Sequence, residues 1–149
     1  MSLQDMLGKG ELQPHRTSRQ ELDGLRKVVE RDLQDSRLQG LSADRRFATA
    51  YNAALQSGIM ILYCSGYRPS TSRGGHHRNV FEALRHILDS SHHDRIDYFD
   101  SCRRKRNTLD YDTAGLISET EADELVEQAL EFHEIAEDWI QKNSPDLAG

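Results

Sequence analysis

Cysteine and proline are scarce in this sequence of 149 residues, which contains two cysteines and three prolines. Cys64 and Cys102 lie far apart in the chain and lack the spacing of a metal-binding pair. We therefore expect reduced thiols and no disulfide framework. Apolar runs long enough to cross a bilayer are also missing, as is a leader with a charged start and an apolar centre. These absences predict a cytoplasmic protein that does not associate with membranes.

The composition is that of one domain with a modest core. Apolar residues make up 36% of the chain and charged residues 30%, which is enough for one buried core beneath a strongly solvated surface. No stretch alternates as a strand would, and every durable segment has a helical period. The sequence predicts an all-α fold, an up-and-down bundle of four or five helices. We expect a flexible tail over residues 1–17, the bundle over 18–143 and a C-terminal tail over 144–149.

Serine residues mark the start of three predicted helices. Ser18 and Ser118 are each followed by a glutamate three residues later, a pattern that predicts a capping box. Ser42 predicts the start of a second helix that is apolar over much of its surface, and Gly66 predicts its end. Asp94 predicts the start of the fourth helix. These signals predict helices joined mostly by short loops.

The clearest loop covers residues 66–75 and contains three glycines, a proline and two arginines. It leads into a helix predicted from about His76 to Leu88. A glycine-rich loop before a helix can bind phosphate through backbone N–H groups, but neither a preceding strand nor the Gly-Lys-Ser/Thr ending of a P-loop is present. We expect a flexible connector that places Arg68, Arg73 and His76 near a substrate.

Four of the seven histidines occur as the neighbouring pairs His76-His77 and His92-His93. Adjacent residues on a helix diverge by about 100 degrees, and the i, i+4 spacing of zinc-binding helices is absent. We therefore expect no metal site and no other cofactor, and interpret these histidines as surface residues.

The charges are unevenly distributed along a chain whose net charge is −6. Residues 66–107 contain nine Lys/Arg and five Asp/Glu, a net charge of +4, whereas residues 108–149 contain one and twelve, a net charge of −11. A basic centre beside an acidic helix is compatible with a phosphate-binding face. It is equally compatible with an acidic helix that packs against the basic segment.

Four consecutive cations, residues 103–106, precede Asn107, and Tyr111 follows. If this segment is helical, Arg103, Arg106 and Asn107 share one face. Arginine offers a planar fork for phosphate oxygens, asparagine orients a neighbouring group, and a phenol can donate or accept a proton. Arg104 would add a contact to the phosphate backbone. Cations at a helix C-terminus also complement the helix dipole without any ligand, so the run by itself leaves both interpretations open.

The segment Arg106-Asn107-Thr108-Leu109-Asp110-Tyr111 resembles the signature of HEPN domains. These are small helical bundles that include RNA-cleaving toxins and companions of minimal nucleotidyltransferases. The family motif is an arginine, a polar residue and, four to six residues later, a histidine. Arg106 and Asn107 fill the first two positions, whereas Tyr111 stands at the position of the histidine. The resemblance extends over about residues 41–140, and a Gly-His-His element at 75–77 implies a substrate-binding role for His76 or His77.

The resemblance implies a homodimer and engagement of RNA or a nucleotide. In one interpretation the chain is a metal-independent endoribonuclease of the toxin type, with Arg106, Asn107 and Tyr111 as catalytic residues and Arg103 and Arg104 as substrate contacts. A free phenol with a pKa of about 10 is a poor base beside an imidazole with a pKa of about 6.5. The second interpretation is therefore a non-catalytic module that binds RNA or nucleotide, or that docks a nucleotidyltransferase or antitoxin partner. A structural dimer without a ligand is the third.

Overall fold

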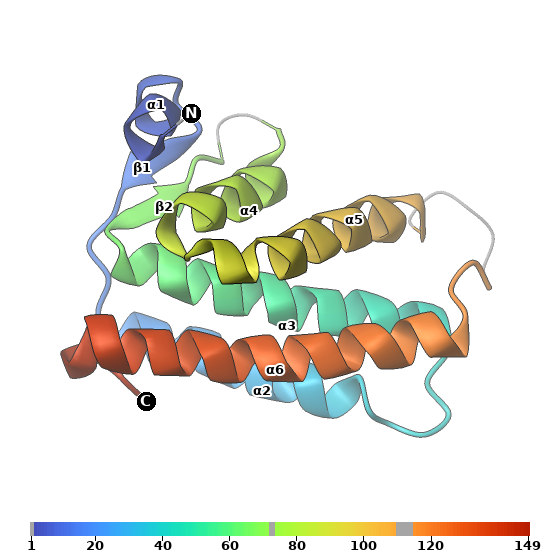
Figure 1. The fold of residues 1–149 in the computed structure, drawn as a ribbon. Coiled ribbons are helices and arrows are strands. Elements are labelled where there is room, and N and C mark those ends of the chain that lie inside the picture. Colours follow the sequence, from blue (N-terminus) through green and yellow to red (C-terminus); the bar gives the residue numbers. More distant parts are fainter. Residues whose placement is uncertain (1, 72–73, 110–114) are drawn as a thin grey trace.

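The computed structural model describes residues 2–71, 74–109 and 115–149 of the chain. Figure 1 shows a bundle of helices with one small sheet at one end. In chain order, the elements are α1 (Leu3–Gly8), β1 (Leu12–Pro14), α2 (Arg19–Asp35), α3 (Ala43–Cys64), β2 (Tyr67–Pro69), α4 (His76–Ile87), η1 (Ser90–His92), α5 (His93–Leu109), α6 (Glu119–Asn143) and η2 (Pro145–Leu147). The prediction of an all-α bundle is confirmed.

The long helix α3 forms the centre of the bundle. In Figure 1 it runs between α4 and α5 on one side and α6 and α2 on the other. Its start is capped as predicted, because the N–H of Arg45 donates to the Ser42 hydroxyl at 3.2 Å. Its end is also as predicted, since Gly66 has a φ of 95° just beyond the helix, a conformation that glycine adopts without strain.

Gly58 allows α3 and α4 to pack closely. A Cβ atom at this position would lie 2.7 Å from Cδ1 of Leu84 on α4 and 3.7 Å from Phe132 on α6. Leu84 is fully buried, as is Phe132, so neither side chain has solvent to move into. The absence of a side chain at Gly58 therefore sets how near α4 lies to the central helix.

Replacing Gly58 by alanine should destabilise the bundle. Overpacking a tight core typically costs about 1–3 kcal/mol, and the gain in helix propensity from glycine to alanine, about 1 kcal/mol, offsets only part of it. Gly24 on α2 provides the matched control, because nothing lies within 4 Å of its virtual Cβ. In urea unfolding we expect Gly58→Ala to lower the free energy of unfolding and Gly24→Ala to raise it. A stabilised Gly58→Ala protein would contradict the tight contact.

The helix directions place the start of α4 beside the end of α5. Figure 1 shows α3, α4 and α6 running in one direction, with α5 opposed. Buried aromatic rings join α4, α5 and α6. The ring centroid of Phe99 lies 6.3 Å from that of Phe81 and 5.1 Å from that of Phe132. Aromatic contacts at these distances stabilise beyond the area they bury.

The N-terminal segment differs from the expected flexible tail. Residues 3–8 form α1, which begins with a capping box between Ser2 and Asp5 and buries Met6 completely. Strand β1 then pairs antiparallel with β2, with Leu12 opposite Pro69. The expectation that no segment is a strand is corrected by this sheet. Both features depend on contacts distant in sequence, so a local pattern does not reveal them, and the domain limits at residues 17 and 143 stay a prediction.

Other helix ends are partly as predicted. The capping box of Ser118 and Glu121 is present. At α2 the Ser18 hydroxyl accepts from the N–H of Glu21 as expected. The Glu21 carboxylate instead accepts from the Thr17 hydroxyl at 2.7 Å. The predicted cap at Asp94 is wrong, because α5 already begins one residue earlier, directly after the turn η1.

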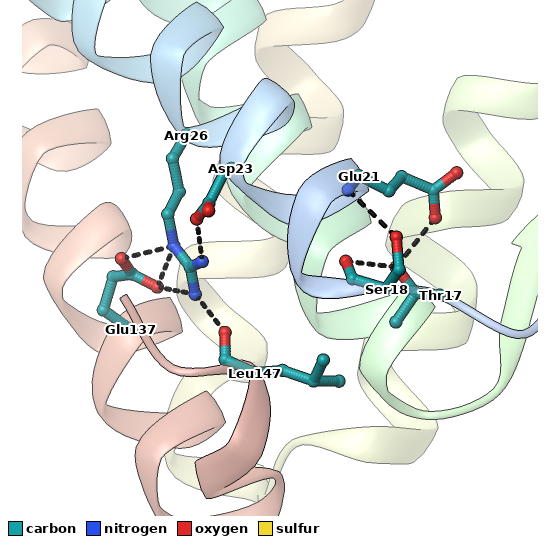
Figure 2. A network of polar contacts seen from close by, with 7 residues as sticks. All are labelled: Thr17, Ser18, Glu21, Asp23, Arg26, Glu137 and Leu147. Atoms are coloured by element: carbon teal, nitrogen blue, oxygen red, sulfur yellow. Dashed lines mark hydrogen bonds and ion pairs between the residues drawn. The ribbon is translucent and has the colours of Figure 1, made fainter.

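Arg26 ties α2 to α6 and to the C-terminal residues (Figure 2). Its Nε donates to the Glu137 carboxylate at 2.9 Å, Nη1 donates to Asp23 at 2.8 Å, and Nη2 donates to the Leu147 carbonyl at 2.7 Å. The Arg26 side chain is only 7% exposed. Ala148 is buried as well, so the C-terminal residues pack on the bundle where a tail was expected.

Substituting Arg26 by methionine keeps the apolar stem but leaves Glu137 without its cation. Because Glu137 is 29% exposed, we expect a loss of about 1–3 kcal/mol, less than for a fully buried pair. Lys27→Met is the control, since this neighbouring lysine is exposed and has no ion pair in the described part of the chain. Thermal unfolding should show a lower Tm for Arg26→Met alone, and equal Tm values would contradict a stabilising network.

Candidate functional site

The first turn of α4 and the last turns of α5 form a groove of about 230 Å³. Its lining is rich in hydrogen-bond donors and consists of Gly75, His76, His77, Arg78, Arg103, Arg106 and Asn107. The predicted helical spacing accounts for one wall, since Arg103, Arg106 and Asn107 lie three and four residues apart on α5. The groove opens to solvent between the two helices.

Arg106 differs from the cations next to it in the chain. Arg103 donates from Nε to Asp100 at 2.8 Å, Arg104 donates from Nη1 to the same carboxylate at 2.9 Å, and Lys105 pairs with Glu121. For Arg106, no ion pair joins it to any other residue within 2–71, 74–109 and 115–149. Its guanidinium carbon instead lies 5.8 Å from the centroid of the Tyr51 ring, within the range of a cation–π contact.

Tyr51 of α3 also contacts His77. The Tyr51 hydroxyl lies 3.3 Å from Nδ1 of His77, and the two ring centroids are 6.0 Å apart. The Tyr51 side chain is 1% exposed, so its hydroxyl is shielded from bulk water. A buried hydroxyl normally has a hydrogen-bond partner. Tyr51 thus lies beneath both walls of the groove and contacts one residue from each.

Burial and charge control the protonation of this pair. Burial raises the pKa of the Tyr51 phenol well above its usual value, so the hydroxyl keeps its proton. Burial, and secondarily the charges of His76, Arg106 and Arg103, lower the pKa of His77 to about 4. His77 is therefore a neutral imidazole at neutral pH.

The predicted site residues divide into three groups. Those that line the groove are Arg103, Arg106, Asn107, His76 and His77. Arg104 is 62% exposed and turns to Asp100 outside the groove. Arg73 and Tyr111 lie outside the described residues.

Sequence reasoning missed Tyr51 and Arg78 as parts of this site. Arg78 carries no special sequence signal, because it is one exposed arginine among many. The sequence pattern predicts that Tyr51 is a core residue on an apolar helix face, and Tyr51 is buried in the structure. The one usable signal is chemical, because a buried tyrosine needs a partner for its hydroxyl.

Acidic side chains of α6 pair with cations of the basic segment 66–107 and with Arg46 of α3. Arg95 of α5 pairs with Glu131 at 2.7 Å, Lys105 pairs with Glu121, and Arg46 of α3 pairs with both Glu119 and Asp123. The structure therefore contains the contact between the acidic helix and the basic segment that the charge distribution allowed. A neighbouring hollow of about 290 Å³ between α4 and α5 is lined by Glu82, Asp97 and Asp100 as well as by arginines, which disfavours an anion there.

Within residues 2–71, 74–109 and 115–149, no group of three or more His, Cys, Asp or Glu side chains is arranged to hold a metal ion. In the same ranges no helix is both long enough and apolar enough to cross a membrane.

Comparison with protein-family models identifies the family to which these helices belong. The family model described as SAV_6107-like HEPN matches residues 39–137, more than half of the chain. The chain belongs to the HEPN family. The match covers α3, α4, α5 and most of α6, and thus every helix that lines or underlies the groove. Comparisons with curated proteins and with solved structures gave no significant match.

The ionisation of His77 can be measured directly in this HEPN domain. In the folded protein we expect an NMR titration midpoint near pH 4, and Arg106→Ala should raise it because one nearby positive charge is removed. Burial is the larger cause, so the midpoint should stay below 6.5.

The same shift predicts a pH dependence of stability. Between pH 6.5 and about 4 the unfolded chain binds a proton at His77 that the folded state does not. The stability contributed by His77 is therefore present above pH 6.5 and is lost as the pH falls through this window. A His77 midpoint near 6.5 in wild type would contradict both expectations.

Proposed function

We propose that this HEPN domain binds phosphate groups of RNA or of a nucleotide in the groove between α4 and α5. The observation that carries the proposal is Arg106, a guanidinium at a groove wall that has no carboxylate partner among the described residues. A guanidinium without a carboxylate partner keeps its planar fork available for phosphate oxygens. The position of Arg106 is also that of the family's motif arginine.

The surroundings of Arg106 support an anionic ligand. Arg103 and Arg78 line the same groove and add positive charge, and the exposed amide of Asn107 can orient a neighbouring ribose or base. The chain as a whole has a net charge of −6, so general attraction to nucleic acid is weak. Binding must then depend on this local cluster.

Cleavage is the second candidate, and it rests on the motif. Arg106 would hold the scissile phosphate and stabilise its developing negative charge, while Tyr111 would activate the ribose hydroxyl or donate to the phosphate. Pairing with a second copy would bring two grooves together, as the family resemblance implies. Docking of a nucleotidyltransferase or antitoxin by the same face is the non-catalytic alternative.

The test measures binding and cleavage of a single-stranded RNA in EDTA. Fluorescence anisotropy across several salt concentrations should show binding by wild type, about 10–100-fold weaker binding by Arg106→Ala, and a salt slope reduced by about one. Arg104→Ala is the matched control, because this arginine precedes Arg106 on the same helix but turns away from the groove. Its affinity should stay within about three-fold of wild type.

The outcomes separate the candidates. RNA cleavage that Arg106→Ala abolishes would establish a ribonuclease, and Tyr111→Phe would then report whether the phenol transfers protons. Binding without cleavage would establish the non-catalytic module. If wild type does not bind RNA or nucleotides, or if Arg104→Ala and Arg106→Ala weaken binding equally, the groove is not the phosphate site.

A further inference from the structure

Tyr51 and His77 form a unit that determines which atoms face a ligand in the groove. Within the described residues, the only hydrogen-bond partner of the Tyr51 hydroxyl is Nδ1 of His77, at 3.3 Å. The phenol stays protonated at neutral pH and needs an acceptor for its proton. Nδ1 is that acceptor, and the neutral ring must then carry its own proton on Nε2. The ring nitrogen left for a ligand is thus a donor.

The other groups that line the groove are also mostly donors. The guanidinium groups of Arg78, Arg103 and Arg106 carry N–H groups and cannot accept a hydrogen bond. Asp100 already accepts from Arg103 and Arg104 and is not part of the lining. The neutral acceptors in this set are the side-chain carbonyl of Asn107, an exposed residue, and the one acceptor nitrogen that a neutral imidazole offers at His76.

A lining made mostly of donors favours a ligand that offers acceptors. A phosphate monoester has three unesterified oxygens and carries a charge of about −1.5 to −2 at pH 7. An internal phosphodiester has two such oxygens and one charge. Four side chains that donate, three of them arginines, therefore match the monoester better in both charge and number of acceptors.

We propose that the groove binds a terminal phosphate, the monoester end of an RNA strand or of a nucleotide, and that Tyr51 is its positioning residue. This inference rests on the proposed phosphate-binding function and names the class of phosphate. Tyr51 does not touch the ligand. It orients the two groups that do, because its hydroxyl holds His77 and its ring lies beneath Arg106.

The experiment compares one short oligoribonucleotide with a 5′-phosphate, with a 3′-phosphate and with hydroxyls at both ends, together with a free nucleoside monophosphate. In anisotropy measurements, and in competition for the free nucleotide, wild type should prefer at least one phosphorylated ligand by about ten-fold or more over the hydroxyl-ended strand. Which ligand is preferred identifies the source of the phosphate. Arg106→Ala should abolish the preference.

Two further substitutions test the Tyr51 and His77 unit. Tyr51→Phe should reduce the preference to about three-fold or less, because His77 is then free to take the other tautomer. Tyr63→Phe is the matched control: Tyr63 lies on the same helix, its ring is 4.4 Å from that of His15, and it does not line the groove. His77→Gln should retain part of the preference by presenting an amide donor, whereas His77→Leu should lose it.

Nitrogen-15 NMR of the imidazole gives a readout independent of any ligand. Wild type should show the proton on Nε2 of His77, and Tyr51→Phe should show a mixture of tautomers. A proton on Nδ1 in wild type would overturn the inference, as would a phosphate preference unchanged in Tyr51→Phe and His77→Leu. Equal, Arg106-dependent binding of all three strands would overturn it while leaving the proposed function standing, and no binding of any ligand would remove both.

Discussion

The close contact between α3 and α4 at Gly58 is the constraint on which the rest of the structure depends. A side chain there would meet Leu84 at 2.7 Å, so α4 can lie this near the central helix only because the Cβ atom is absent. The same approach brings the first turn of α4 over Tyr51, seven residues before Gly58 on α3 and thus about two helical turns away. The hydrogen bond to His77 depends on that distance. The groove is therefore a consequence of backbone packing in the core as much as of the polar side chains that line it.

Among the four consecutive cations 103–106, ion pairs within the described residues then leave only Arg106 without a carboxylate partner. The basic segment of the sequence is largely neutralised by acidic partners, within α5 through Asp100 and from α6 through Glu121 and Glu131. These pairs are mostly exposed and each contributes little to stability. Their larger effect is on specificity, because they remove most of the cations from competition for anions. Arg106 lies over an aromatic face instead of a carboxylate, so within the described ranges its charge is the one on α5 most available to a phosphate.

The helices were predictable where the signals are local, and the site was predictable only in part. Ser42 and Gly66 mark the bounds of α3, and the cations of α5 follow a helical period, so one wall of the groove could be inferred from spacing alone. The docking of α1 through Met6 and the pairing of β1 with β2 join segments more than fifty residues apart, which no local pattern encodes. The role of Tyr51 in the groove was not predicted for a different reason. In a periodic pattern a tyrosine that orients a site and a tyrosine that fills a core look alike, and only the position of its hydroxyl separates them.

The chemistry of the groove bears on the departure from the family motif at Tyr111. A ribonuclease without a metal needs a group that accepts a proton from the attacking hydroxyl. In the inferred tautomer, His77 has Nδ1 occupied by the Tyr51 hydroxyl, and its remaining nitrogen donates. His77 thus cannot replace the missing motif histidine in its resting tautomer. His76 also lines the groove, and Tyr111 stands at the motif position with a phenol whose ordinary pKa of about 10 makes it a poor base at neutral pH. Under the proposed function, the phenol at the motif position therefore favours binding of a phosphate over its cleavage.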